Sequence, residues 1–100
     1  MQKPVDRLKR KIDKENLWLF ILSSLEGKKR YGKELRGLIE KKFDFITGKV
    51  TAYKILYLLE SGGYVKSKKV GKRVYYEITS SGKRELQEGR KYLKKLSKTI

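Results

Sequence analysis

The stretch from Thr47 to Thr79, TGKVTAYKILYLLESGGYVKSKKVGKRVYYEIT, combines the pattern of a helix with that of a β-hairpin. Between Thr51 and Leu59 the apolar residues recur at intervals of three and four, the spacing of one face of an α-helix. Gly62 and Gly63 follow, and a glycine can take the left-handed conformation that closes a last helical turn. We therefore predict a helix that ends at this glycine pair and leads directly into two strands.

The hairpin is predicted around the two-residue turn of Val70-Gly71-Lys72-Arg73. Gly71 stands at the first central position, where a type II′ turn requires a positive φ. A slip of one residue would scramble both faces of the hairpin, so the pattern favours one register. The cross-strand pairs predicted by this register are Val65 with Ile78, Lys66 with Glu77, Ser67 with Tyr76, Lys68 with Tyr75, and Lys69 with Val74.

The hairpin tip, residues 66–73, holds five cations and no acid. The helix face opposite its apolar stripe carries Thr47, Val50 and Lys54, with Tyr57 nearer the edge, and has no acid until Glu60. A helix that ends directly in a basic hairpin is the pattern of a recognition helix and wing. The predicted fold class is therefore mostly α with a β-hairpin wing (α+β), a winged helix-turn-helix.

The segments before this unit are predicted to be helical. Residues 1–14 form a short basic helix with Pro4 in its first turn and a thin apolar stripe. The next helix, capped by Asp13 or Asn16, runs to about Leu25 and is apolar all round, so it is expected to be buried on several sides. A basic loop at 26–30 leads to a third helix at 31–43. In the turn after that helix, residues 44–48, we expect Phe45 and Ile46 to tuck under the recognition helix.

The last helix, at about 80–98, is capped by Thr79 or Ser80 and has Gly82 in its first turn. Its apolar positions fall at spacings of three and four, as in a coiled-coil seam, and Gly89 on this seam would permit close helix approach. One 100-residue core cannot absorb this seam and the N-terminal stripe, so a second copy is the expected cover. The predicted dimer interface consists of Val5, Leu8, Ile12, Trp18, Leu86, Leu93 and Leu96.

The length, charge and residue content of the chain restrict the classes of function that it can have. The chain has 100 residues, room for one domain, and 27 Lys and Arg against 11 Asp and Glu give a formal charge of +16. This excess favours a polyanion, either nucleic acid or an anionic membrane surface, although surplus lysine can also serve solubility alone. The absence of cysteine and histidine excludes disulfides, thiolate sites and the usual proton shuttle, so we expect no enzyme, no metal and no cofactor. The longest apolar run, of six residues, predicts a soluble, intracellular protein without a membrane segment.

Two groups of residues are candidates for contacts to nucleic acid. The helix offers hydrogen-bonding side chains suited to base edges and phosphates, and the hairpin offers cations suited to the phosphates. The alternative is a plain solvated surface, because any exterior helix face must be polar. We interpret Tyr76 as a core residue and leave Tyr75 open. The candidates are Lys49, Thr51, Tyr53 and Lys54 on the helix, and Lys68, Lys69, Lys72 and Arg73 on the hairpin.

These motifs resemble those of the PadR-like transcriptional regulators, a winged-helix family. The most specific parts are the spacing of Tyr53, Leu56, Leu59 and Gly63, and the run of Tyr75-Tyr76, Thr79 and Gly82. In two respects this chain differs from the family pattern: the Gly-Tyr that often opens the second helix is Tyr31-Gly32 here, and a single C-terminal helix matches only the short members. The other matching segments are 17–22 (LWLFIL), 31–35 (YGKEL), 50–60 (VTAYKILYLLE), 63–65 (GYV) and 73–79 (RVYYEIT).

The resemblance implies a homodimeric repressor that binds double-stranded DNA, in the cytoplasm and on the nucleoid, with the terminal helices forming the dimer. It also implies that a small aromatic effector can bind near the dimer interface, where Trp18 would form a wall of the site; plain core or interface packing is the alternative for this residue. Two other functions stay open at this stage: a sequence-tolerant chromatin or RNA-binding module, and a protein-interaction module whose charge is incidental.

Overall fold

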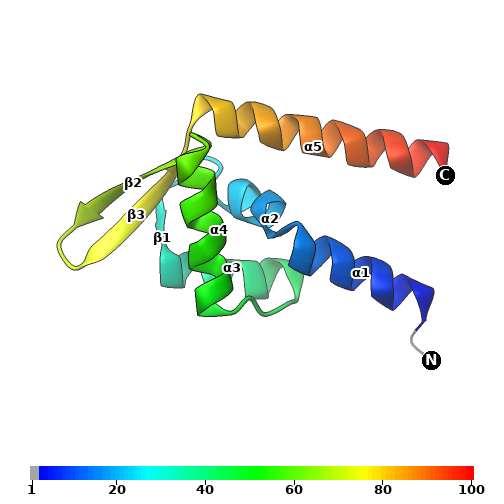
Figure 1. Ribbon diagram of the computed structural model, residues 1–100, viewed down its shortest axis with the longest axis horizontal. Coiled ribbons are helices and arrows are strands. Elements are labelled where there is room, and N and C mark those ends of the chain that lie inside the picture. The colour runs from blue at the N-terminus through cyan, green and yellow to red at the C-terminus, as the bar shows by residue number, and fades with distance from the viewer. Residues whose placement is uncertain (1–2) are drawn as a thin grey trace.

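The computed structural model describes residues 3–100, which form five helices and a three-stranded sheet (Figure 1). The order of elements confirms the predicted fold class, a winged helix-turn-helix with an additional C-terminal helix. None of the helices in this range is long and apolar enough to cross a membrane. The elements are α1 (Pro4–Glu15), α2 (Leu17–Ser24), β1 (Arg30–Tyr31), α3 (Gly32–Phe43), α4 (Lys49–Ser61), β2 (Val65–Val70), β3 (Arg73–Ile78) and α5 (Ser80–Thr99).

The hairpin has the predicted register, from Val65 opposite Ile78 to Val70 opposite Arg73. Gly71 has a φ of 63°, and no other turn residue has a positive φ, as a type II′ turn requires. The sheet also contains a strand that the sequence did not reveal. Arg30, predicted to end a loop, and Tyr31, predicted to begin the third helix, form β1 instead and pair antiparallel with β3, giving the order β1-β3-β2. Two residues show no alternation, so only the pairing with β3 defines this strand.

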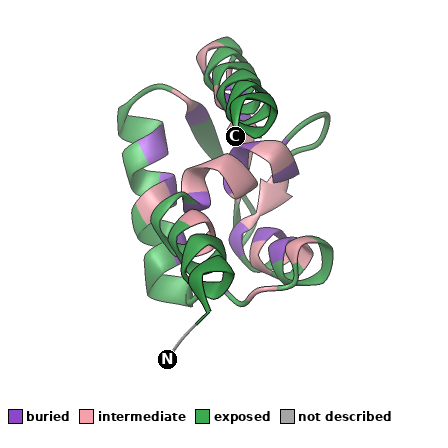
Figure 2. Ribbon diagram, turned by 90° about the vertical axis from the view of Figure 1, so that its right-hand side faces the viewer, coloured by how far each residue is buried: buried purple, intermediate pink, exposed green. Residues whose placement is uncertain are grey.

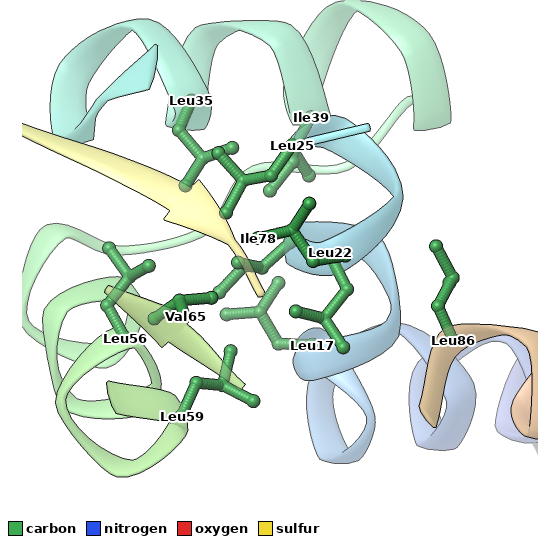
Figure 3. Packing of buried hydrophobic residues seen from close by; sticks show 11 residues of the cluster. Leu17, Leu22, Leu25, Leu35, Ile39, Leu56, Leu59, Val65, Ile78 and Leu86 are labelled. Carbon is green, nitrogen blue, oxygen red and sulfur yellow. The ribbon is translucent and has the colours of Figure 1, made fainter. Parts of the chain in front are cut away.

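The core is organised around α2 (Figure 3). Its buried residues Leu17, Ile21 and Leu22 meet side chains from α3, α4, the sheet and α5, which explains why this helix is apolar all round. Burying each such side chain contributes about 1.5–3 kcal/mol. The members contributed by the surrounding elements are Leu35, Ile39, Leu56, Leu59, Val65, Ile78 and Leu86.

In the turn between α3 and α4, Phe45 and Ile46 lie in different environments, although both were expected to be covered by the recognition helix. Phe45 was expected to pack under the recognition helix; it packs edge-to-face on Phe20 of α2, with ring centroids 5.0 Å apart, and is partly buried against the core. The prediction for Ile46 is wrong, because its side chain is 76% exposed. Asp44 closes α3 in the left-handed conformation, with a φ of 61°. Because neighbouring side chains in extended backbone point to opposite sides, the residue after Phe45 faces solvent.

Specific backbone contacts join α4 to the sheet and the sheet to α5. Gly63, with a φ of 81°, ends α4 in a Schellman motif in which the Tyr64 N–H donates to the Leu59 carbonyl at 2.9 Å. At the start of α5 the Thr79 hydroxyl accepts from the Gly82 N–H at 3.1 Å, which confirms the predicted cap. Gly82 lies so close to the Tyr64 carbonyl that a Cβ atom there would collide with it. The root of α5 is therefore tightly fixed to the body.

The helix α1 and the second half of α5 extend beyond the body on the same side of the molecule and stay apart (Figures 1 and 2). Along them Val5, Leu8, Leu93 and Leu96 keep 40–58% of their surface exposed. Leu86 differs from the other predicted interface residues. It is 1% exposed and belongs to the core of its own protomer, so it has no surface left for a second copy.

Candidate nucleic-acid interface

The recognition helix α4 has one buried face and one exposed face. Ala52, Leu56 and Leu59 point into the core. Three of the predicted contact residues of this helix, Lys49, Thr51 and Lys54, are exposed. Neither of the two lysines forms an ion pair within residues 3–100. Exposed side chains that donate hydrogen bonds or carry positive charge can reach base edges and phosphates.

Two apolar side chains share this exposed face, Val50 at 83% and Tyr57 at 69% exposure. Apolar groups at such positions can contact the methyl group of thymine. Thr47, which the helical projection had placed on the same face, is buried instead. The helix begins only at Lys49, so a helical projection does not apply to a residue that lies before its cap at Gly48.

The fourth predicted contact residue, Tyr53, has a structural role that its sequence position did not reveal. Its hydroxyl lies against the backbone of Gly32, where a Cβ atom would collide with it. Because Gly32 is the first residue of α3, this contact fixes the two helices of the helix-turn-helix relative to each other. Its remaining surface, 37% exposed, borders the groove between these helices.

That groove between α3 and α4 has a volume of about 350 Å³, and its lining carries more basic than acidic residues. Lys33 and Arg36 of α3 line it beside Lys49, with Glu40 as its acid. Lys33 and Arg36 are not among the residues that the sequence predicted to contact nucleic acid. Their relation to α4 depends on the crossing of the two helices, for which a single helical pattern carries no signal.

The wing presents three unpaired lysines. Lys68, Lys69 and Lys72 are exposed and form no ion pair within residues 3–100. Lys68 and Lys69 are neighbours on one strand and therefore point to opposite faces of the hairpin. The predicted wing cations thus surround the tip rather than forming one flat patch.

The fourth wing cation, Arg73, is directed back across the sheet. Its guanidinium lies 4.2 Å from the ring centroid of Tyr31, a cation–π contact. Contact with the Tyr75 hydroxyl, and secondly the nearby Tyr31, raises the pKa of Arg73 above its usual value. Tyr75 in turn packs edge-to-face on Tyr31 at 5.7 Å. An arginine held in this way keeps its charge and has fewer conformations to lose when it binds a phosphate.

The same sheet carries one acid near the wing cations, Glu77. Its carboxylate lies 3.8 Å from both Lys66 and Lys29. The Lys66 contact confirms the predicted cross-strand pair. Because the two ammonium groups flank one carboxylate, this part of the wing also keeps a net positive charge.

A carboxylate that sequence reasoning had not assigned joins the wing to the recognition helix. Glu60, in the last turn of α4, accepts hydrogen bonds from the Ser67 N–H at 3.0 Å and from its hydroxyl at 2.6 Å. On the inner face of the sheet, Tyr76 packs against the core, as predicted, and burial raises the pKa of its hydroxyl. Helix and wing are therefore held together at their junction.

Comparison with known proteins agrees with this architecture. The profile of the transcriptional regulator PadR-like family matches residues 21–88. The chain belongs to this family. Its members are DNA-binding regulators of transcription rather than enzymes, which confirms both the resemblance noted from the sequence and the expectation that the protein has no catalytic role. Among curated proteins, no sequence matches the chain.

Solved structures similar to this chain include a transcriptional regulator from Clostridium thermocellum, with 29% identity and a TM-score of 0.80 over 89% of this chain and 92% of that one. A PadR family transcription regulator from Clostridium difficile has 27% identity and a TM-score of 0.78, over 83% and 92% of the two chains. A winged-helix DNA-binding protein from STIV, at 24% identity and a TM-score of 0.74 over 83% and 91%, shares the fold.

Proposed function

We propose that this PadR-like protein binds a specific double-stranded DNA site as a homodimer and represses transcription there. The observation that carries the proposal is the exposed face of α4, with Lys49, Thr51 and Lys54 unpaired and no acid in the first turn of the helix. Thr51 and Lys54 would meet base edges in the major groove, and the wing lysines would lie along the flanking phosphates. Such binding would place the protein on the nucleoid.

The homodimer is proposed from the exposed apolar stripes of α1 and α5. Both helices leave the body on the same side, and a second copy would cover Val5, Leu8, Leu93 and Leu96 in one step (Figure 1). A two-fold dimer would present two recognition helices. We therefore expect a pseudo-palindromic site whose half-sites lie about one helical turn, or a multiple of it, apart.

The experiment compares binding to a selected site with binding to random duplex. Thr51→Ala or Lys54→Ala should weaken binding to the selected site by about 1–3 kcal/mol and leave random binding nearly unchanged. Lys72→Ala should weaken both kinds of binding alike, and should flatten the slope of log K against log salt by about one unit for each protomer in which Lys72 makes one phosphate contact. Equal losses on both duplexes for every variant, with no palindromic site from selection, would support the sequence-tolerant chromatin function, which the charge of +16 also suits. If the protein bound RNA but not duplex DNA, the RNA-binding alternative would be supported. If it bound neither nucleic acid, the protein-interaction alternative would be supported.

Repression and an effector are the two finer parts of the proposal. Repression is measured by placing the selected site over a promoter with a reporter gene; activation of the reporter would contradict it. For the effector, Trp18 is half-buried, and its ring edge lies against Gly89 of α5, beside the proposed dimer contact. A planar aromatic ligand bound there should quench Trp18 emission. A panel of planar cationic and phenolic compounds that leaves this emission unchanged would favour regulation without a ligand.

A further inference from the structure

The helix α1 carries a basic stripe on the face opposite its apolar one. Lys3, just before the helix, is followed by Arg7, Arg10 and Lys14 at intervals of four, three and four residues, which places them on one side. All four are exposed, and within residues 3–100 none of them forms an ion pair. The ion pair that α1 does form, Lys11 to Glu15 at 2.7 Å, lies outside the stripe.

The C-terminal end of this stripe lies beside the start of the recognition helix. Lys14 lines a pocket of about 210 Å³ together with Ile46, Gly48 and Thr51. Asp13 is in the same pocket, and Asp6 lies about two helical turns earlier. These two acids therefore border the stripe along one edge without interrupting it. From this point α1 extends away from α4 on the side opposite the wing (Figure 1). The wing, α4 and the α1 stripe therefore form a row of three basic elements.

We propose that the basic stripe of α1, Lys3, Arg7, Arg10 and Lys14, binds the DNA backbone next to the site read by α4, on the side opposite the wing. The inference rests on the proposed function, because it places the stripe on the same duplex. A helix of 12 residues is about 18 Å long, which corresponds to about five base pairs. The footprint of each protomer would extend by that length beyond the half-site.

Opposite faces of α1 would then serve different partners. The stripe of Val5, Leu8 and Ile12 points away from the basic stripe, toward a second copy of the chain. Dimerisation would hold α1 in place through its apolar face and thereby orient the cations. A basic amphipathic helix can also lie on an anionic membrane. The position of Lys14 at the start of α4 favours DNA, because a bilayer on this face would have to displace the recognition helix from the duplex.

The test uses the full chain with the double variant Arg7→Gln/Arg10→Gln. The matched control is Lys94→Gln/Lys98→Gln, which removes the same charge from exposed lysines of α5 on the side away from its apolar seam. Each protein is titrated with two duplexes, one ending at the selected site and one extended by about six base pairs at each end. Vesicles containing anionic phospholipid serve as a third probe. Circular dichroism and light scattering check that fold and oligomeric state are unchanged.

The parent should bind the extended duplex more tightly than the short one. Arg7→Gln/Arg10→Gln should bind the extended duplex roughly 5- to 20-fold more weakly, and should flatten its salt slope by about two units for each protomer of the dimer, while its affinity for the short duplex stays within about twofold of the parent. The α5 control should retain the preference for the extended duplex. If the first variant alters the fold, Lys3→Gln/Arg7→Gln replaces it with the same expectation, because both residues lie at the end of α1 that is distant from α4.

Three results would overturn the inference: equal losses for the α1 and α5 variants, no dependence on duplex length in the parent, or vesicle binding that is lost with the α1 cations while DNA binding is kept. Failure of the proposed function is distinguishable from these. It would show as a parent without preference for the selected site over random duplex, whereas failure of the α1 inference alone would leave the Thr51→Ala and Lys54→Ala effects intact.

Discussion

The body of the molecule and its two arms differ in what they do with apolar side chains. In the body, which comprises α2, α3, α4 and the sheet, residues such as Ile21, Leu22 and Leu35 are at most 1% exposed. In the arms, which are α1 and residues 90–99 of α5, four apolar residues keep 40–58% of their surface in water. The core of the body is thus buried within one protomer, whereas the apolar surface that these four arm residues still expose would have to be covered by another molecule.

The largest effect is expected from a charge placed in an arm. Leu93→Asp should abolish dimerisation, because an unpaired charge buried in an apolar interface is unfavourable by about 3–5 kcal/mol, or at least a hundredfold in the dissociation constant. Size-exclusion chromatography with light scattering should show a dimer for the parent and a folded monomer, or an aggregate, for the variant.

The control is Lys94→Asp, one residue further along the same helix and outside the seam, which should stay dimeric. A parent that is monomeric at high micromolar concentration would contradict the assignment of the arms as a dimer contact.

A smaller but still large loss is expected at the junction of body and arm. In Gly82→Ala the new Cβ would meet the Tyr64 carbonyl and Ile78, so backbone would have to move, and stability should fall by about 2–4 kcal/mol. Gly37→Ala is the matched control: Gly37 is exposed within α3 and has no neighbour within 4 Å of an added Cβ. It should gain up to about 1 kcal/mol from helix propensity. Urea unfolding measures both, and equal effects would refute the junction contact.

The same substitution, threonine to valine, can be made at the junction of body and arm and at the end of the α5 arm, and the two losses of stability can be compared. The Thr79 hydroxyl donates to the Gly63 carbonyl at 2.6 Å and accepts from the Gly82 N–H, so Thr79→Val should cost about 1–2 kcal/mol. Within residues 3–100 the Thr99 hydroxyl donates one hydrogen bond, to the Lys95 carbonyl at 2.8 Å, at the exposed end of the arm. Thr99→Val should therefore change thermal or urea stability by less than about 0.5 kcal/mol. A loss at Thr99 as large as that at Thr79 would mean that the arm end contributes to the body.

The smallest effect concerns the ion pair that ties α5 to the body. Arg90 binds the Glu26 carboxylate through two hydrogen bonds, at 2.6 and 2.9 Å, and this bonding lowers the pKa of Glu26 below 4.5. A lowered folded-state pKa stabilises the protein above the unfolded pKa, and this contribution is lost as pH falls through the folded value. Because the two side chains are 43% and 42% exposed, solvent screens the pair, and we expect less than about 1 kcal/mol.

The measurement is urea unfolding of the parent and of Glu26→Gln at pH 7 and at pH 3. Their difference in stability should narrow as the pH falls from 7 to 3, because the contribution of the ion pair is lost as the pH passes through the lowered pKa of Glu26. Arg90→Gln should behave in the same way. A difference that does not depend on pH would show that the loss comes from packing rather than from charge.

Sequence patterns predicted what depends on local periodicity. The hairpin register followed from paired residues such as Lys66 with Glu77, because a strand has a period of two. The cap at Thr79 and the exposed face of α4 followed from equally local rules. Strand β1 could not be predicted, since two residues have no period and Arg30 joins the sheet only through β3. The exposure of Ile46 depended on the path of a short turn.

The parts of the site that were missed are contacts between elements distant in sequence. Nothing in the local pattern relates Tyr53 to Gly32, or Arg73 to the ring of Tyr31. The α5 seam shows a related ambiguity. A helix has apolar residues at spacings of three and four whether it packs on its own protomer or on a partner. The spacing therefore could not distinguish Leu86, which is buried in its own protomer, from Leu93, which is 40% exposed.

The junction at Gly63 also restricts how this protein can change in length. Only Tyr64 separates that glycine from β2, so the chain has no slack there. One inserted residue would shift β2 by one position, turning Lys66 inward and Val65 toward solvent. At Gly71 an insertion would lengthen only the exposed tip. Over evolutionary time, the wing of this protein is therefore free to grow or shrink at its tip, while its root tolerates neither insertion nor deletion.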